Sequence, residues 1–558
     1  MNVSAQHSES SWGTRLLALT VLNCLLQIGW FWRFQSNNIT IDAINYIGLA
    51  RHLVDGHFVL SLHGYWSPLF SWLIAAGSLL SRNLLLVGRI ITIGSFLVCL
   101  LLLYRLAWNL WRSRVAAAFA VLWFSLCRGV VAVSVGTILA DFLLVAAALV
   151  YFTLLLSCLR ENRKAAWVLL GAAHAVAFLA KAFAMPWLTI STVLALLTSQ
   201  WKSPRQLIAR GLLAFLVPAL VWLTWGEVLK TKYGVFTTGY QLRANLMVGL
   251  HRMMNPYEDR AQNFLDTSAD FDAYMVGEAS WPKLQKFNMS DPQLLTVVLD
   301  SERRNIPAAV KEVAILLTPG GLVGLAAGLV LLTRNRFRYS AEASFAWIAL
   351  VSLLALIGAY CMLVFDSRYV LPITPVLIAV ACNFVLPAKD SLHGGLDSGP
   401  WVQRSALGLL VVSWLFLLVY WASPFRTLSQ NYQISCHEAA AVLRAQQPDG
   451  NTLVSIGEGP YPAHGIGFEA GIYAAYLSGR HVIAMNAALP RAEEADPLIA
   501  AVLEKDSDAV VVWGEPPSDV YRTIVHSLQS APGAVSHIAV RDPQRGEVGT
   551  VILFRRRV

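Results

Sequence analysis

Long apolar runs separated by short polar segments dominate the chain up to about residue 422. Each run has about 17–25 residues, the length at which a helix crosses roughly 30 Å of hydrocarbon. A shorter apolar segment, residues 68–81, is too short to cross and predicts a juxtamembrane or re-entrant helix. The predicted spanning helices lie at residues 14–32, 84–107, 115–133, 137–158, 165–181, 184–199, 207–228, 308–332, 341–364, 368–386 and 405–422. The pattern therefore predicts about eleven spans, the first of them retained rather than removed as a signal peptide.

The Lys and Arg residues between the apolar runs predict the orientation, because cytoplasmic loops carry an excess of positive charge. The basic clusters are Arg105, Arg112 and Arg114; Arg160, Arg163 and Lys164; Lys202, Arg205 and Arg210; and Arg334, Arg336 and Arg338. The eleven-span assignment places all four clusters in the cytoplasm. It leaves three pieces outside: a first loop at 33–82, a long loop at 229–307, and the tail.

The tail, residues 423–558, is more polar and is predicted to be a soluble domain. Short β-rich runs alternate with helical stretches, which is typical of an α/β or α+β domain. The strands are predicted at 452–456, 509–513 and 549–554, and the helices at 436–446 and 519–529. The fold class is therefore mainly α, with a transmembrane bundle at 1–422 and an extracytoplasmic α/β domain after it.

The composition agrees with an integral, multi-pass membrane protein. Of the 558 residues, 56% are hydrophobic and 14% are charged, whereas roughly 25% are charged in an average soluble protein. The net charge of +9 comes from the topology clusters, so it does not indicate nucleic-acid binding. Six of the seven cysteines lie in or beside apolar runs, which excludes a disulfide framework.

Four ionisable residues are predicted at or near the outer membrane face: Asp42, Asp141, Lys181 and Arg368. Charge in a bilayer is costly, so such residues are candidates for function. Two carboxylates and two cations at one interface suit proton abstraction and phosphate binding. Each also has a structural alternative. The two cations are candidates for interfacial anchors, Asp141 for a buried hydrogen-bonded residue, and Asp42 for a helix cap.

The first outer loop carries the most specific pattern. Residues 41–56 predict an amphipathic helix that has Asp42 at its start and Gly56 at its end. The segment Gly64-Tyr65-Trp66-Ser67-Pro68 then leads into a second interfacial helix.

This loop resembles the first outer loop of the lipid-dependent GT-C glycosyltransferases, in the branch of protein O-mannosyltransferases and lipid A aminoarabinose transferases. Three further segments resemble elements of that family in the same order. They are Thr137-Ile138-Leu139-Ala140-Asp141, Ala177-Phe178-Leu179-Ala180-Lys181, and Arg368-Tyr369-Val370-Leu371-Pro372-Ile373-Thr374-Pro375. The resemblance covers roughly residues 14–386, while the tail matches in its location and in residues 476–480.

Two positions depart from the family pattern. Ala43 follows Asp42 where many relatives carry an acidic pair. Trp66 and Ser67 stand where the aminoarabinose enzymes carry a Glu-Lys pair. The second departure argues against a specific aminoarabinose assignment.

The resemblance implies an inverting transfer of a hexose or pentose from a polyprenyl-phosphate carrier to a glycan, lipid or protein acceptor. The reaction would take place on the outer, extracytoplasmic face of the membrane, which would be a bacterial inner membrane. Asp42 would be the general base and Asp141 would orient the acceptor or a sugar hydroxyl, while Lys181 and Arg368 would hold the carrier phosphate. Aromatic residues that would line the substrate site are Tyr46, Tyr65, Trp66 and Tyr369, although such residues also occur at interfaces without a catalytic role.

Two functions of other classes stay open. A transporter or lipid flippase would use charged residues along a path, but such proteins often show inverted repeats and ionisable residues near the midplane, and the chain shows neither. A non-catalytic scaffold for glycan assembly would use the tail to bind a partner. The expected partners in all three cases are membrane lipids, with a lipid-linked sugar donor for the enzyme.

No metal is required by this interpretation, although a divalent ion stays an alternative. Asp270 and Asp272 have the spacing of a metal-binding pair, but a solvated loop explains them as well. A zinc site is not expected either, because His251, His464 and Glu469 lack the ligand spacing of one. The glycines of residues 465–471 miss the dinucleotide-binding spacing by one residue.

Overall fold

The computed structural model divides into two compact units. Its described residues are 3–35, 39–127, 130, 134, 137–200, 203–243, 246, 292–333, 340–362, 367–382, 433–448, 452–458, 466–487, 499–500, 503, 508–513, 519–542 and 546–555. The first of the two units, here the helical unit, comprises Met1–Ser36, Leu49–Leu242 and Leu295–Ser423. The second, here the sheet unit, comprises Asn37–Gly48, Arg243–Leu294 and Pro424–Val558.

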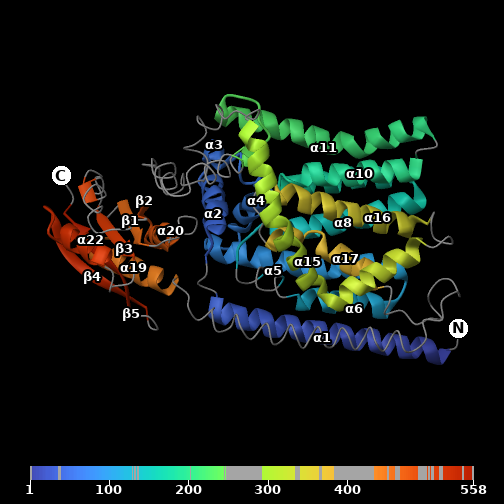
Figure 1. Cartoon of the computed structure of the whole chain (residues 1–558), viewed down its shortest axis with the longest axis horizontal. Helices are drawn as coiled ribbons and strands as arrows, with labels where there is room; N and C mark the ends of the chain where they lie inside the picture. The colour runs from blue at the N-terminus through green and yellow to red at the C-terminus, as the bar shows by residue number, and fades with distance from the viewer. Residues whose placement is uncertain are drawn as a thin grey trace. The chain divides into compact units, whose positions relative to one another are not determined.

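The helical unit is a bundle in which α1, α5, α8, α10, α11 and α16 run roughly parallel to one another (Figure 1). Its helices are α1 (Val3–Gln35), α3 (Phe58–Ser61), α4 (Pro68–Gly77), α5 (Leu84–Trp111), α6 (Arg114–Leu126), α8 (Asp141–Glu161), α9 (Lys164–Ala180), α10 (Ala184–Gln200), α11 (Pro204–Tyr233), α16 (Ala341–Cys361), the 3-10 helix η2 (Ser367–Val370) and α17 (Thr374–Ala381). Two more helices, α2 (Ile41–Val54) and α15 (Pro292–Thr333), each have residues in both units.

Nine of the eleven predicted spans coincide with helices in the described part of the chain: α1, α5, α6, α8, α9, α10, α11, α15 and α16. Four of these, α5, α8, α11 and α16, are long and apolar enough to cross a membrane by length and composition. The segment 68–81 forms the ten-residue helix α4, which is too short to cross. The span predicted at 405–422 lies outside the described residues, so the count of eleven stays a prediction.

The span predicted at 368–386 differs from a continuous helix. It opens with η2 and a turn, and α17 then covers only Thr374–Ala381. Pro372 and Pro375 explain the interruption, because proline lacks the N–H that a helix interior needs and is tolerated in a first turn. The interruption leaves Arg368 and Tyr369 in the short 3-10 helix η2, ahead of α17, rather than inside a continuous α-helix.

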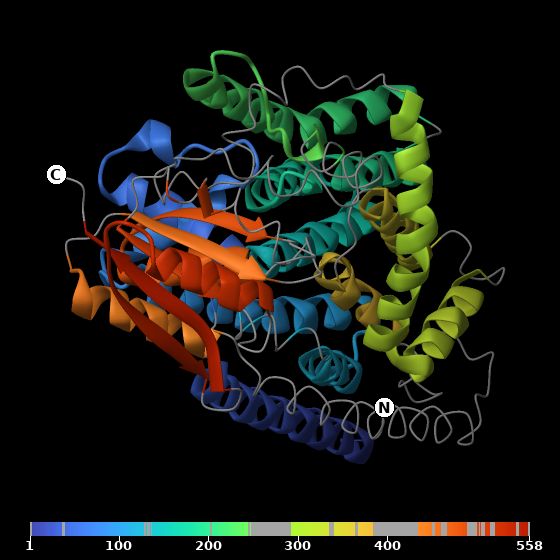
Figure 2. The same cartoon turned by 60° about the vertical axis from the view of Figure 1, so that its left-hand side comes forward.

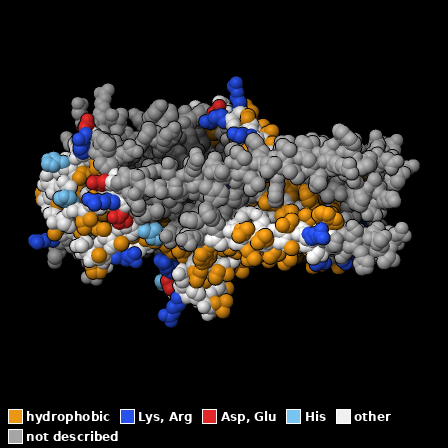
Figure 3. Space-filling view, turned by 90° about the horizontal axis from the view of Figure 1, so that it is seen from below, with side chains coloured by type: hydrophobic (Ala, Val, Ile, Leu, Met, Phe, Trp, Pro, Cys, Tyr) orange, Lys and Arg blue, Asp and Glu red, His pale blue; other side chains and the backbone are white. Residues whose placement is uncertain are grey.

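Packing places α8 at the centre of the bundle and α11 at its edge. Most of the apolar window of α8 is buried, whereas little of that of α11 is buried. The exposed side chains of α11 include Ile208, Leu212, Leu216 and Leu220. In the face shown in Figure 3, hydrophobic side chains gather over the helical unit. An apolar exterior of this kind suits contact with lipid.

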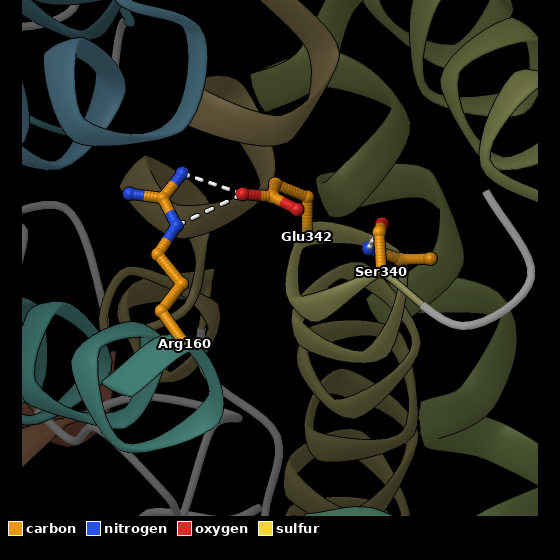
Figure 4. Close-up of polar contacts among 4 residues, drawn as sticks. Arg160, Ser340 and Glu342 are labelled. Carbon is orange, nitrogen blue, oxygen red and sulfur yellow. Dashed lines mark hydrogen bonds and ion pairs between the residues drawn. The ribbon is translucent and has the colours of Figure 1, made fainter. Parts of the chain in front are cut away.

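Polar contacts fasten the helices at the end that is predicted to be cytoplasmic. The Arg160 guanidinium contacts one oxygen of Glu342, with Nη2 at 2.7 Å and Nε at 2.8 Å (Figure 4). Ser340 caps α16 by accepting a hydrogen bond from the Ala343 N–H at 3.0 Å. Asn162, which ends α8 in the left-handed conformation, accepts from Trp167 Nε1 and Arg210 Nε, both at 3.1 Å. These bonds link α8 to α9, α11 and α16.

The sheet unit contains a five-stranded sheet in the order β2-β1-β3-β5-β4. Its elements are α19 (Gln433–Gln446), β1 (Thr452–Glu458), α20 (Ile466–Ser478), β2 (His481–Ala487), β3 (Ala509–Trp513), α22 (Asp519–Gln529), β4 (Ala534–Asp542) and β5 (Gly546–Phe554). Strands β1, β2 and β3 are parallel, and β5 runs antiparallel to β3 and β4. Figure 2 brings this sheet forward. The predicted α/β character of the tail is confirmed.

Helices pack on both faces of the sheet. Successive side chains of a strand point to opposite faces, so each face has its own set of residues for a helix to contact. Val454, Val510 and Ile552 pack with Tyr521 and Ile524 of α22. On the opposite face α20 lies so close to β1 that a Cβ at Gly471 would overlap the Ser455 side chain. The glycine at 471 therefore serves helix-to-strand packing in a β1-α20-β2 unit.

Residues 476–480, which resemble the family in sequence, have a structural role. Gly479 ends α20 with a φ of +72°, a value that favours glycine. Arg480, 1% exposed, donates to the Leu443 carbonyl at 3.2 Å and to the Gln447 carbonyl. Arg480 thus satisfies carbonyls at the C-terminal end of α19.

Candidate active site

Asp141 and Lys181 form a direct ion pair in the helical unit. Asp141 is in the first turn of α8 and its side chain is 1% exposed, while Lys181 directly follows α9 and is 19% exposed. The distance from Lys181 Nζ to Asp141 Oδ1 is 2.7 Å. Each charge also suits its helix end, because a carboxylate is favoured at an N-terminus and a cation at a C-terminus. Two residues that the sequence predicted at one face are therefore in contact.

Arg368 and Tyr369 extend this group. Lys181 Nζ lies 5.3 Å from the centroid of the Tyr369 ring, and Arg368 Cζ lies 5.6 Å from it. Both distances are in the range of a cation–π contact. Asp141, Lys181, Arg368 and Tyr369, here the charged cluster, thus bring four of the eight predicted site residues together from α8, the end of α9 and η2.

A stack of aromatic rings supports the cluster. Tyr369 stacks on Tyr360 of α16 with 4.1 Å between centroids and 13° between planes, and Phe183 lies 4.3 Å from Tyr360. Sequence reasoning missed Tyr360 and Phe183, since aromatic residues at helix ends are common at interfaces. The one available signal was that Phe183 follows Lys181 by two residues.

Replacing Tyr360 with Leu is expected to weaken use of the lipid-linked donor that the family resemblance implies, because an aromatic pair contributes about 0.5–1.5 kcal/mol beyond buried area. That energy corresponds to roughly 2–12-fold in KM for the donor, with a smaller change in kcat. Tyr360→Phe keeps the ring and should restore the KM. Steady-state kinetics on both variants measures the effect. A loss in the Phe variant as large as in the Leu variant would show that the hydroxyl, rather than the stack, matters.

The first loop is joined to the segment that follows Lys181. Ser67 Oγ accepts a hydrogen bond from the Ala182 N–H at 2.8 Å. Just before it, Tyr65 and Trp66 pack edge to face with 4.8 Å between ring centroids. The predicted substrate-lining aromatics Tyr65 and Trp66 are therefore tied, through Ser67, to the residue next to Lys181.

His63 organises the same loop. Its Nδ1 accepts hydrogen bonds from the N–H groups of Tyr65 at 2.9 Å and Trp66 at 3.1 Å. The ring proton is therefore on Nε2, which lies 3.2 Å from the Tyr240 hydroxyl. Burial, and secondarily the charge of Lys232, lowers the pKa of His63 well below its ordinary value. His63 is thus a neutral hydrogen-bonding residue and not a general acid at neutral pH.

The folded state should lose stability as the pH falls below about 6.5, the ordinary pKa of histidine. The lowered pKa of His63 keeps it neutral when folded, so the unfolded chain binds the additional proton, and the effect is up to about 1.4 kcal/mol per pH unit. His63→Asn retains an acceptor and should remove this part of the acid sensitivity. Thermal unfolding at pH 7 and pH 5 measures it, with His52→Asn as the control. Equal acid sensitivity in the His63 variant and the wild type would contradict the assignment.

Asp42 and Tyr46 lie on α2, in the part that belongs to the sheet unit. Asp42 is half-buried in the first turn and Tyr46 is buried. Thr40 Oγ1 accepts the Ala43 N–H at 3.1 Å, so Thr40 makes the capping bond. Thr40, rather than Asp42, is therefore the residue that caps α2.

Several weaker candidates lie outside the described residues: Asp270, Asp272, His251 and His464. In the ranges that the structure does describe, no group of three or more His, Cys, Asp or Glu side chains could hold a metal ion.

Comparisons with known proteins agree with this architecture. Residues 66–225 match the family described as dolichyl-phosphate-mannose-protein mannosyltransferase. No curated protein sequence gives a significant match. The structure of ArnT from Cupriavidus metallidurans in the apo state has a TM-score of 0.54 at 14% identity, with 98% of each chain covered. The chain has a GT-C fold.

Two further structures share this GT-C fold. ArnT from the same organism bound to undecaprenyl phosphate gives a TM-score of 0.52 at 13% identity, with 97% of this chain and 98% of that chain covered. The Archaeoglobus fulgidus oligosaccharyltransferase tethered to an acceptor peptide gives 0.52 at 13% identity, covering 98% of this chain and 74% of that one. The family match includes Trp66, Asp141 and Lys181 and ends before Arg368.

Proposed function

We propose that the protein is a membrane glycosyltransferase that moves a sugar from a polyprenyl-phosphate carrier to an acceptor. The charged cluster carries this proposal, because Lys181 and Arg368 contact one ring and supply two cations in one place. A phosphate is the anion that such a pair suits. The GT-C fold, and a relative of that fold bound to undecaprenyl phosphate, support the same donor class.

The proposed reaction inverts the configuration of the sugar. Asp42 takes the proton of an acceptor hydroxyl, the acceptor oxygen bonds to the anomeric carbon, and the bond from that carbon to the phosphate oxygen breaks. Lys181 and Arg368 bind the departing polyprenyl phosphate, whose negative charge increases as it leaves. Tyr46, Tyr65, Trp66 and Tyr369 are proposed to line the substrate site.

The active side is proposed to be the extracytoplasmic face, because only then are all four basic clusters cytoplasmic. A cysteine placed at Gly450 in the tail should react with a membrane-impermeant reagent from outside. A second cysteine at Arg336, between predicted spans, should react only after the membrane is permeabilised. Labelling of position 450 from the cytoplasmic side alone would contradict the proposed sidedness.

Transfer itself tests the function. The purified protein in lipid nanodiscs should release polyprenyl phosphate from a polyprenyl-phosphate sugar when an acceptor is supplied. A panel of hexose and pentose donors, with glycan, lipid and peptide acceptors, would identify the pair by mass spectrometry. Binding of the carrier without transfer to any acceptor would favour a scaffold or a flippase.

A further inference from the structure

The ion pair of Asp141 and Lys181 leaves the carboxylate dependent on one partner. Asp141 Oδ1 lies 2.7 Å from Lys181 Nζ. The other oxygen, Oδ2, is buried and has no hydrogen-bond partner among the residues that the structure describes. A carboxylate that is 1% exposed keeps its charge at low cost only while a cation accompanies it. Lys181 is that cation.

Lys181 is also one of the two cations proposed to hold the carrier phosphate. Its side chain is partly exposed and lies on the Tyr369 ring, so a ligand can reach it. A phosphate on Lys181 would place a second anion beside Asp141, whose side chain is buried. Two anions at one ammonium repel each other more strongly there than in bulk solvent.

We propose an exchange of partners at Lys181. The donor phosphate draws the Lys181 ammonium away from Asp141, and the Asp141 carboxylate, left without its counter-ion, takes up a proton. This inference rests on the proposed function. It makes donor binding proton-linked. It also leaves Asp141 as a neutral acid, whose O–H is a donor for a sugar or phosphate oxygen.

Other ionisable groups near α8 do not replace Lys181. The helix packs against α5, α9, α10, α16 and α17, and α10 and α17 carry no Asp, Glu, Lys, Arg or His. On the other three helices, the ionisable residues toward the Asp141 end of α8 are Arg89 and Cys99 on α5, His174 on α9, and Tyr360 and Cys361 on α16. Cys99 Sγ donates to the Phe142 carbonyl, and His174 Nε2 lies 3.1 Å from the Met185 carbonyl. Within the described residues, Lys181 alone forms an ion pair with Asp141.

The test uses the full chain in nanodiscs and a polyprenyl phosphodiester, whose single charge does not titrate near neutral pH. Calorimetry in two buffers of different ionisation enthalpy should show uptake of close to one proton on binding. Asp141→Asn should abolish the uptake and bind the probe roughly fivefold or more tightly, the lower end of typical couplings between sites. Asp55→Asn removes an exposed carboxylate on the first loop and should change neither quantity.

Each other outcome overturns the exchange. Weaker binding by Asp141→Asn would show that Asp141 supports Lys181 for phosphate. Binding by the wild type without proton uptake would show that both anions share the ammonium. If the Asn variant does not fold, the affinity of the wild type for the probe, measured at several pH values, still decides. The exchange requires this affinity to rise as the pH falls. No binding of the probe to the wild type would remove the proposed donor site as well, whereas binding without uptake removes the exchange alone.

Discussion

Replacing Asp42 with Asn is expected to lower the rate of sugar transfer by about 10²–10⁴-fold, the usual contribution of a general base. Asn keeps the size and part of the hydrogen bonding of Asp while removing its basicity. Ala43 follows Asp42, so that position supplies no substitute carboxylate. Single-turnover transfer with a saturating donor measures the chemical step.

Asp55→Asn is the matched control, since it removes a carboxylate from the turn after α2. The control should transfer at the wild-type rate, and both variants should bind the donor. Thr40, rather than Asp42, caps α2, so the Asp42 variant should also keep its thermal stability. A folded Asn variant with near-normal turnover would remove Asp42 from the mechanism.

The periodicity of the chain predicted the helices because lipid imposes a fixed apolar length on each span. That rule fails where proline interrupts a run, as at Pro372 in the tenth predicted span. The rule applies to spans alone, and the strands β2 and β4 of the tail were not predicted. Among the described strands β4 pairs with β5 alone, at the edge of the sheet. Its sequence includes His537 and Arg541, so its apolar alternation is weak.

The contacts of the site were less predictable than its residues. The motifs identified Asp141, Lys181, Arg368 and Tyr369, but no spacing in the chain indicates that Lys181 pairs with Asp141, forty residues away. The Tyr360 ring and the Ser67 hydroxyl act through contacts between segments that are distant in sequence. Such contacts depend on how the helices pack, which local patterns do not encode.

Alanine at Arg368 is expected to weaken binding of polyprenyl phosphate by about tenfold to a hundredfold. Hydrogen bonds to charged groups contribute about 1.5–3 kcal/mol, and each 1.4 kcal/mol is a factor of ten. Arg368→Lys should still weaken the site, because a lysine cannot form the two parallel bonds of a guanidinium. Titration of the purified variants with the lipid phosphate measures the affinity.

Lys181 needs a different comparison, because its removal leaves Asp141 buried without a counter-ion, a change that typically costs 3–5 kcal/mol of stability. The double variant Lys181→Met with Asp141→Asn removes both charges together and should stay folded. It should bind the lipid phosphate more weakly than Asp141→Asn alone, which isolates the contribution of the ammonium. If Lys181 and Arg368 serve only as interfacial anchors, insertion and stability would change while the affinity of the folded variants would not. Unaltered affinity in the Arg368 and the double variants would therefore refute the donor assignment.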